Sequence, residues 1–128
     1  MSNVRIASLD HLVLTVADPD ATVAFYERLG LRREIFDDGR LALRFGDQKI
    51  NLHRAGRPIQ PHALRPTPGS ADVCLLVDGS LDEAERELER AGIVFELGPV
   101  SRTGAAGPLR SLYLRDPDGN LVELSERR

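Results

Sequence analysis

The amino-acid sequence predicts an α+β fold made of two tandem βαβββ units. The order of strand and helix signals along residues 9–53 is repeated along residues 72–125. In this repeat Asn51 aligns with Glu123, and His11 with Asp72. Most predicted strands alternate apolar and polar residues, as expected for sheets that pack one face on helices. The chain has 128 residues, of which 41% are hydrophobic and 29% charged, enough for one domain with its own core. We therefore expect a single domain over 1–128, with a first unit at about 7–56, a linker at 57–69 and a second unit at about 70–126.

The first unit begins with a strand over residues 9–16, which are rich in β-branched and apolar side chains. Asp18 and Pro19 are typical of a helix start, and Gly30 of a helix end, so we expect a helix over 21–29. Strands over 31–36, 41–45 and 49–53 follow, separated by turn residues at 37–39 and 46–47.

The second unit follows a proline-rich stretch and repeats this order. A strand over 72–77 leads to Ser80, which we expect to cap a helix that ends at about residue 91. Glu83 lies at the capping-box position and Gly92 at the helix end. We predict further strands over 93–97, 109–115 and 120–125. We interpret the glycine-rich segment 101–108 as a loop over a pocket mouth.

Composition excludes several classes of partner. The formal net charge is −3 and no segment concentrates basic residues, which argues against nucleic acid. No apolar run approaches the roughly 20 residues that a membrane helix needs. The first residues lack the apolar core of a signal peptide. The single cysteine, Cys74, cannot form an internal disulfide, so we expect a cytoplasmic protein.

The alternation within strands predicts two faces for each sheet. Leu12, Leu14 and Val16 form an apolar face that should meet the helices, whereas His11 points to the other side. Apolar residues also occur on these other faces, namely Val13, Leu76 and Leu121. Because fully solvated faces would be polar throughout, we expect the second faces to line a half-enclosed cavity.

Three segments resemble the vicinal oxygen chelate superfamily: LDHLVLTV at 9–16, the helix containing Phe25 and Tyr26, and RDPDGNLVE at 115–123. This group includes glyoxalase I, fosfomycin-resistance transferases, bleomycin-resistance proteins and extradiol dioxygenases. The resemblance covers about residues 7–126. It implies the U-shaped partial barrel of the glyoxalase/bleomycin resistance/dihydroxybiphenyl dioxygenase fold. Segments 45–53 and 102–108 further resemble the subgroup of glyoxalase domain-containing protein 5 and its bacterial relatives.

The resemblance implies a metal site built from the first and last strands of each unit. His11 and Glu123 match the usual ligands, whereas Asp72 stands where a histidine is usual and Asn51 where glyoxalase I has a glutamate. We therefore expect His11, Asp72 and Glu123 to hold a divalent ion. One imidazole with carboxylates suits Mn, Zn, Ni, Fe or Mg, and the extra carboxylate favours harder ions.

Other residues are candidates for catalysis and substrate binding. His53, two residues beyond Asn51, is a third ligand, a proton-transfer group or a plain polar strand residue. Glu123 is the second catalytic candidate. Substrate-binding candidates are Asn51, Arg44, Arg102, Tyr113 and Arg115, with Lys49 as a further cation. For each cation a solvated or structural role is the alternative. We expect Cys74 to be a small buried residue and His62 to be solvated.

Two functions remain open at this point. The first is a metalloenzyme, a lyase, isomerase or dioxygenase-like protein, whose metal chelates vicinal substrate oxygens and stabilises an enolate or oxyanion. The alternative is a metal-free, ligand-sequestering protein like the bleomycin-resistance proteins, which Asp72 favours. In either case we expect a small-molecule ligand and a homodimer, because each unit supplies only half a cup with open sheet edges.

Overall fold

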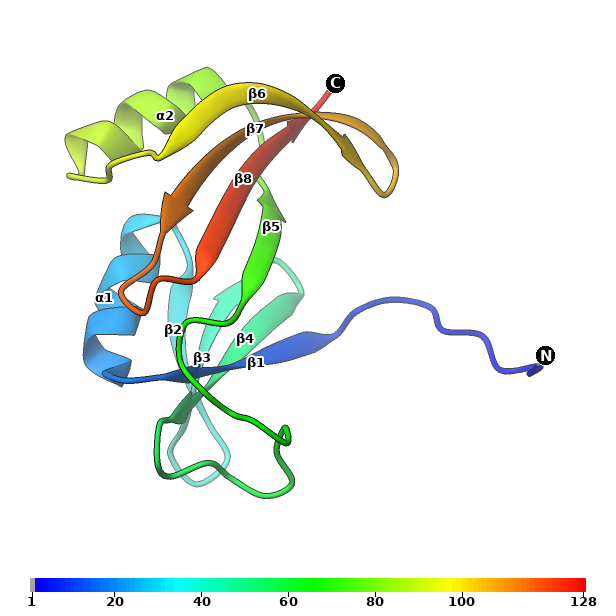
Figure 1. Cartoon of the computed structure of the whole chain (residues 1–128), viewed down its shortest axis with the longest axis vertical. Coiled ribbons are helices and arrows are strands. Elements are labelled where there is room, and N and C mark those ends of the chain that lie inside the picture. Colours follow the sequence, from blue (N-terminus) through cyan, green and yellow to red (C-terminus); the bar gives the residue numbers. More distant parts are fainter. Residues whose placement is uncertain (1) are drawn as a thin grey trace.

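The computed structural model describes residues 2–128 and confirms the α+β fold with its repeated order of elements. The first unit consists of β1 (His11–Val16), α1 (Pro19–Arg28), β2 (Arg32–Phe36), β3 (Arg40–Phe45) and β4 (Gln48–Arg54). The second consists of β5 (Asp72–Leu76), α2 (Leu81–Arg90), β6 (Leu97–Gly104), β7 (Gly107–Arg115) and β8 (Leu121–Arg127). Residues 2–10 precede β1 and lead away from both sheets (Figure 1).

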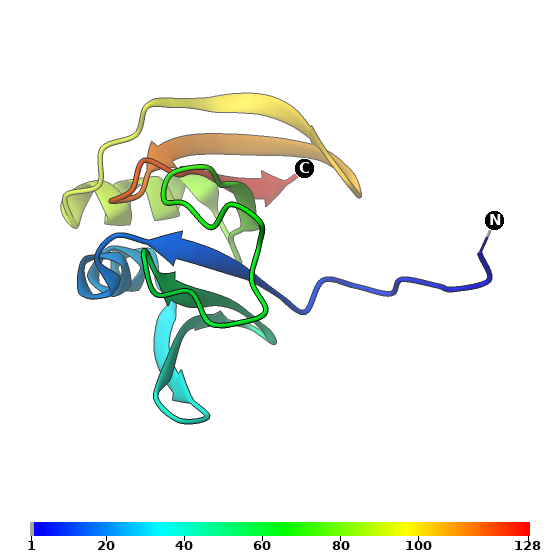
Figure 2. The same cartoon turned by 60° about the horizontal axis from the view of Figure 1, so that its bottom comes forward.

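The two units form two four-stranded sheets with the same topology. The strand orders are β1-β4-β3-β2 and β5-β8-β7-β6. In each sheet the first and last strands of the unit pair in parallel, and the other pairs are antiparallel. Both helices lie on the same side of the molecule, opposite the N-terminal segment (Figure 2). Neither helix is long and apolar enough to cross a membrane.

The strand register confirms how the two halves correspond. His11 pairs with Lys49 and Val13 with Asn51 between β1 and β4. In the second sheet Asp72 pairs with Leu121, and Cys74 with Glu123. Asp72 therefore occupies the strand position of His11, and Glu123 that of Asn51, as the sequence alignment of the two halves predicts.

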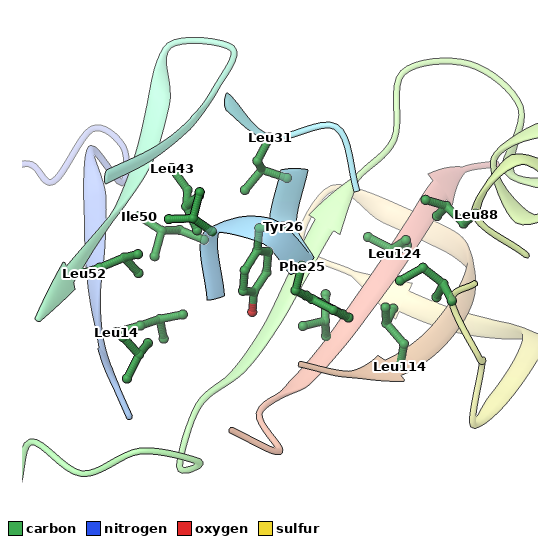
Figure 3. Close-up of a cluster of buried hydrophobic side chains, with 14 of the residues drawn as sticks. Leu14, Phe25, Tyr26, Leu31, Leu43, Ile50, Leu52, Leu88, Leu114 and Leu124 are labelled. Atoms are coloured by element: carbon green, nitrogen blue, oxygen red, sulfur yellow. The ribbon is translucent and has the colours of Figure 1, made fainter. Parts of the chain in front are cut away.

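One hydrophobic core joins the two units. Phe25 and Tyr26 of α1 lie between side chains of the first sheet and Leu114 and Leu124 of the second (Figure 3). The buried members of this core are Leu14, Val16, Val23, Phe25, Tyr26, Leu31, Leu43, Ile50, Leu52, Leu81, Leu88, Ile93, Leu112, Leu114, Val122 and Leu124. The predicted apolar strand faces are thus buried, and the opposite faces are left to form a site.

Both helix starts follow from their capping residues. The Asp18 carboxylate accepts hydrogen bonds from the backbone N–H groups of Asp20 and Ala21, and α1 begins at Pro19, two residues earlier than predicted. Ser80 accepts a bond of 3.3 Å from the Glu83 N–H, which confirms the predicted cap of α2.

The strand predicted over 93–97 is wrong. Ile93 is buried beneath α2 without joining a strand, and β6 begins only at Leu97. Segment 101–108 is therefore part of the β6–β7 hairpin and not a free loop. The register of this pair shifts between Leu97 and Val100, next to Gly98, whose φ is +114°. A Cβ at Gly98 would lie 2.5 Å from the carbonyl oxygen of Ser111, so only glycine fits.

Candidate functional site

The candidate site consists of the sheet faces that the core leaves open. The strand pairing places a second set of side chains on each such face. On the first sheet these are His11, Val13, Thr15, Arg32, Glu34, Phe36, Arg40, Ala42, Arg44, Lys49, Asn51 and His53. On the second they include Asp72, Cys74, Leu76, Val100, Arg102, Ser111, Tyr113, Arg115, Leu121, Glu123 and Ser125. Val13 and Leu76 are 44% and 48% exposed, which leaves apolar surface on both faces.

His11 begins β1 and is held by its neighbour. Its Nδ1 donates to Oδ1 of Asp10 at 2.7 Å, and this bond lowers the pKa of the Asp10 carboxyl. A proton on Nδ1 leaves Nε2 as the atom that can accept a ligand. Metal-binding histidines are commonly oriented by a carboxylate in this way.

Glu123 is half-buried on β8 and is held by two serines. Its Oε2 accepts hydrogen bonds from the hydroxyls of Ser111, at 2.7 Å, and Ser125, at 3.2 Å. Both serines are fully buried. Because both hydroxyls bind the same oxygen, Oε1 is the atom available to another group. The sequence analysis did not identify either serine.

Asp72 and Cys74 belong to β5, the strand that pairs with β8 beside Glu123. Cys74 is exposed in this chain, contrary to the expected burial, with its Sγ 3.2 Å from the Ser125 hydroxyl. Partial desolvation raises the pKa of the thiol, which disfavours the reactive thiolate. Cys74, Leu76 and Glu123 line a pocket of about 320 Å³, and the tip of the β6–β7 hairpin forms another part of its wall. Asp72 is exposed at the start of the strand.

His11 faces a different pocket. It lines a space of about 200 Å³ between the sheet edges, together with Lys49, Cys74 and Leu76. Within residues 2–128 of one chain, no three histidine, cysteine or acidic side chains come together as a possible metal-binding group. A single chain therefore leaves His11, Asp72 and Glu123 divided between the open faces of two sheets.

Asn51 and His53 are buried on β4, each 4% exposed. Oδ1 of Asn51 is buried without a hydrogen-bond partner. Nε2 of His53 lies 3.5 Å from Nη2 of Arg40. Burial first, then the charge of Arg40, lowers the pKa of His53 and keeps the ring neutral near pH 7. Arg40 lies one residue before the strand predicted over 41–45 and was therefore not among the predicted site residues.

The linker covers this end of the first sheet. His62, Ala63 and Pro66 line a pocket of about 470 Å³ together with Val13, Thr15 and His53. The linker thus contributes to the cavity wall, while His62 itself is exposed, as predicted.

Two of the predicted substrate-binding arginines have structural partners. Arg44 binds both carboxylate oxygens of Glu34 at 2.9 and 3.1 Å, and Arg115 binds both oxygens of Glu96 at 3.0 and 3.1 Å. These contacts lower the pKa of each glutamate. Both guanidinium groups are therefore occupied by glutamates of the same chain. This agrees with the structural role that was the alternative for these arginines.

Arg102 and Tyr113 form a pair on the second sheet. Nε of Arg102 donates a 2.8 Å hydrogen bond to the Tyr113 hydroxyl, and its guanidinium lies 5.3 Å from the ring centroid. Tyr113 is directly opposite Glu123 in the strand register. The pair is therefore well placed to contact a molecule bound at Glu123.

This combination of duplicated βαβββ units and polar inner faces defines a known class of proteins. The sequence model of the Glyoxalase/Bleomycin resistance protein/Dioxygenase superfamily matches residues 8–124. The chain belongs to this superfamily, which confirms the resemblance inferred from the sequence. The closer resemblance to glyoxalase domain-containing protein 5 stays a prediction.

Several relatives are similar over nearly the whole chain. The glyoxalase domain-containing protein RDO1 of Mycosarcoma maydis is 52% identical over 120 residues, which span 94% of this chain and 68% of that protein. Virulence protein STM3117 of Salmonella typhimurium is 50% identical over 122 residues, which span 94% of this chain and 85% of that protein. Its crystal structure superposes with a TM-score of 0.95 at 48% identity, covering 98% of this chain and 100% of that chain.

An enzyme of the same superfamily is a more distant neighbour. Lactoylglutathione lyase from Agrobacterium tumefaciens has a TM-score of 0.71 at 25% identity and covers 95% of both chains. The superfamily therefore includes enzymes with this fold, and the activity of the present chain has to be inferred from its own residues.

Proposed function

We propose that this protein is a metal-dependent enzyme that acts as a homodimer on a small molecule. In this proposal His11 of one chain, with Asp72 and Glu123 of a second chain, holds one divalent ion. The main support is the way His11 and Glu123 are held. Hydrogen bonds engage Nδ1 of His11 and Oε2 of Glu123. The other side-chain atom of each, Nε2 of His11 and Oε1 of Glu123, is therefore available to a metal ion.

The donor set fits a divalent cation. An imidazole nitrogen and carboxylate oxygens suit Zn, Fe, Mn, Ni and Mg, and the second carboxylate makes the site harder and more negative. When bound, such an ion supplies a positive charge that stabilises an enolate or oxyanion on a substrate with two neighbouring oxygens.

The chain's own residues would position the substrate and move its proton. His53 is buried and neutral, the form in which an imidazole accepts a proton. Arg102 and Tyr113 present hydrogen-bond donors next to Glu123 on the second sheet. Asn51 contributes an amide on the first sheet, on the face that carries His11. Glu123 remains the second candidate for proton transfer.

The homodimer is supported by what one chain leaves incomplete. The proposed ligands of one chain lie on two sheets and are not gathered into a group within residues 2–128. The apolar Val13 and Leu76 are exposed on the two inner faces, and a second chain facing them would bury both. We also propose a cytoplasmic location, because the single cysteine is an exposed free thiol and such thiols are typical of reducing compartments.

A metal-free binding protein is the second candidate. Asp72 stands where this superfamily commonly has a histidine, and its exposure favours a protein without a metal. Asp72 is exposed at the start of β5, where a carboxylate needs no metal to be stable in water.

Metal analysis separates the two candidates. Protein passed over a chelating resin and reloaded with Mn²⁺ or Zn²⁺ should bind about one ion per chain and unfold at a higher temperature. His11→Ala and Glu123→Ala should each abolish the bound metal, because each removes a ligand. His62→Ala, which removes an exposed histidine, should bind metal normally. Wild-type protein that neither retains metal nor gains stability from any of the five ions favours the binding protein instead.

A further inference from the structure

The open face of the first sheet carries an excess of positive charge. It holds Arg32, Arg40, Arg44 and Lys49 against the single acid Glu34, in a chain whose net charge is −3. Glu34 is bound through both oxygens by Arg44. Lys49 and Arg32 lie near enough to lower the pKa of Glu34 further, but among the described residues neither forms an ion pair with it.

Two of these cations converge on one aromatic ring. Nζ of Lys49 lies 3.4 Å from the ring centroid of Phe36, and Cζ of Arg40 lies 5.0 Å from it. Both cations are half-buried. Among the described residues, neither forms an ion pair with a carboxylate. Two like charges held against one ring repel each other, and a bound anion would relieve this repulsion.

A buried amide without a partner lies on the same face. Asn51 stands on β4 between Lys49 and His53, is 4% exposed, and has its Oδ1 buried without a hydrogen bond. Buried polar atoms are nearly always bonded, so an unpaired one points to a missing group. Ala42 lies directly opposite Asn51 in the register and is itself fully buried, so the Asn51 amide lies in an enclosed part of this face. Turning the amide over exchanges an acceptor for a donor at the same place.

Arg40 lies next to His53. Its Nη2 lies 3.5 Å from Nε2 of the buried, neutral imidazole. Because the neutral ring adds no charge, it does not compete with the guanidinium for an anion. Among residues 2–128 the Arg40 side chain forms no other hydrogen bond, so the guanidinium can make a bidentate contact, which carboxylates match in geometry.

We propose that Arg40, Lys49 and Asn51 form a subsite for the carboxylate group of a small organic acid. Phe36 is the ring that both cations contact, and His53 lies next to Arg40. The identification of this acid as the substrate rests on the proposed function, whereas carboxylate binding itself requires no metal. In this proposal Arg40 and Lys49 select the substrate. Arg44 and Arg115 do not, because they have partners within the chain.

Binding of a simple diacid tests this proposal. Metal-free protein, prepared on a chelating resin, is titrated with succinate and with its neutral counterpart succinamide, and binding is followed by backbone amide NMR signals. Succinate should shift the signals of Ala42, Asn51 and His53, and succinamide should leave them in place. Arg40→Met and Lys49→Met should each weaken succinate binding by about tenfold, since each removes one charge–carboxylate contact.

A matched variant controls for net charge. Arg33 is exposed on β2 but on the opposite face, so Arg33→Met removes the same charge and should change succinate affinity by less than about twofold. Arg40→Lys should restore part of the affinity, and circular dichroism should show each variant folded. Lys49→Met provides an independent test if Arg40→Met does not fold.

Three results would overturn the proposal: equal binding of succinamide, equal weakening by Arg33→Met, or tighter binding of inorganic phosphate than of succinate. The last would assign the subsite to phosphate. Because the titration is done without metal, loss of the metal site leaves its outcome unchanged. Conversely, failure to bind succinate leaves the metal analysis intact.

Discussion

The Tyr26 hydroxyl donates a buried hydrogen bond of 2.7 Å to Oδ2 of Asp116, and this bond joins α1 of the first unit to the β7–β8 turn of the second. The same carboxylate accepts bonds from the Asn120 side chain and from the backbone N–H groups of Asp118 and Asn120. Burial and the neighbouring Asp116 raise the pKa of Tyr26. The RDPDGN turn thus has a structural task, which is to hold the two units together.

Tyr26→Phe should lower the free energy of unfolding by about 1.5–3 kcal/mol, because it deletes a buried hydrogen bond to a carboxylate. Asp116→Ala should cost more, since it leaves several buried donors without an acceptor. Urea unfolding followed by circular dichroism measures both. Tyr113→Phe is the matched control, because Tyr113 is only partly buried, and should cost less than about 1 kcal/mol. Equal losses for the two tyrosine variants would contradict this role.

The stability of the protein should depend on pH through His53. Its pKa is lowered in the folded state, so as pH falls below the usual value of about 6.5 the unfolded chain takes up the proton first. The folded state should therefore lose stability between about pH 7 and pH 5. His53→Gln should flatten this dependence in urea unfolding at several pH values. His62→Gln, at an exposed position, should not. A wild-type profile that His53→Gln leaves unchanged would refute the assignment.

Asp72 should influence which metal the site prefers. Asp72→His replaces a carboxylate with an imidazole, so the variant should bind metal at least as tightly and prefer Zn²⁺ or Ni²⁺ over Mn²⁺ more strongly than the wild type. Competition titrations on the two proteins measure the order of preference. An unchanged order, with loss of stability only, would mean that Asp72 is not a ligand.

The protein should be a dimer at micromolar concentration. Sedimentation equilibrium should give about twice the 14.1 kDa of one chain. Replacing the exposed inner-face residues Val13 and Leu76 with lysine should shift the equilibrium toward the single chain, because buried charges without partners are costly. A mass near 14.1 kDa for the wild type would contradict the dimer.

Local signals in the sequence predicted most of the fold. Ser80 and Glu83 fixed the start of α2 because a cap depends only on residues close in sequence. The duplicated strand pattern predicted the correspondence of His11 with Asp72, since side-chain alternation has a fixed period. β6 was not predicted because Gly98, Pro99 and Gly104 disfavour a strand on their own. Pairing with β7 overrides that preference, and the close approach of β7 requires the glycines.

The arrangement of the candidate site was less predictable. The sequence identified which faces carry polar residues, but not which side chains on them would pair with each other. Arg44 and Glu34 meet across neighbouring strands, so their contact depends on a register that no local pattern encodes. The serines that hold Glu123 were missed for the same reason.

The central claim is that one metal site takes His11 from one chain and Glu123 from the other, and a mixed dimer tests it most directly. His11→Ala and Glu123→Ala chains, co-expressed with different affinity tags and purified through both, give dimers with one chain of each kind. Sites shared between chains leave one intact site per dimer, so the mixed dimer should bind about half the wild-type amount of metal while each parent variant binds none. No metal in the mixed dimer, with a full complement in the wild type, would show that each site is built within one chain and would contradict the account.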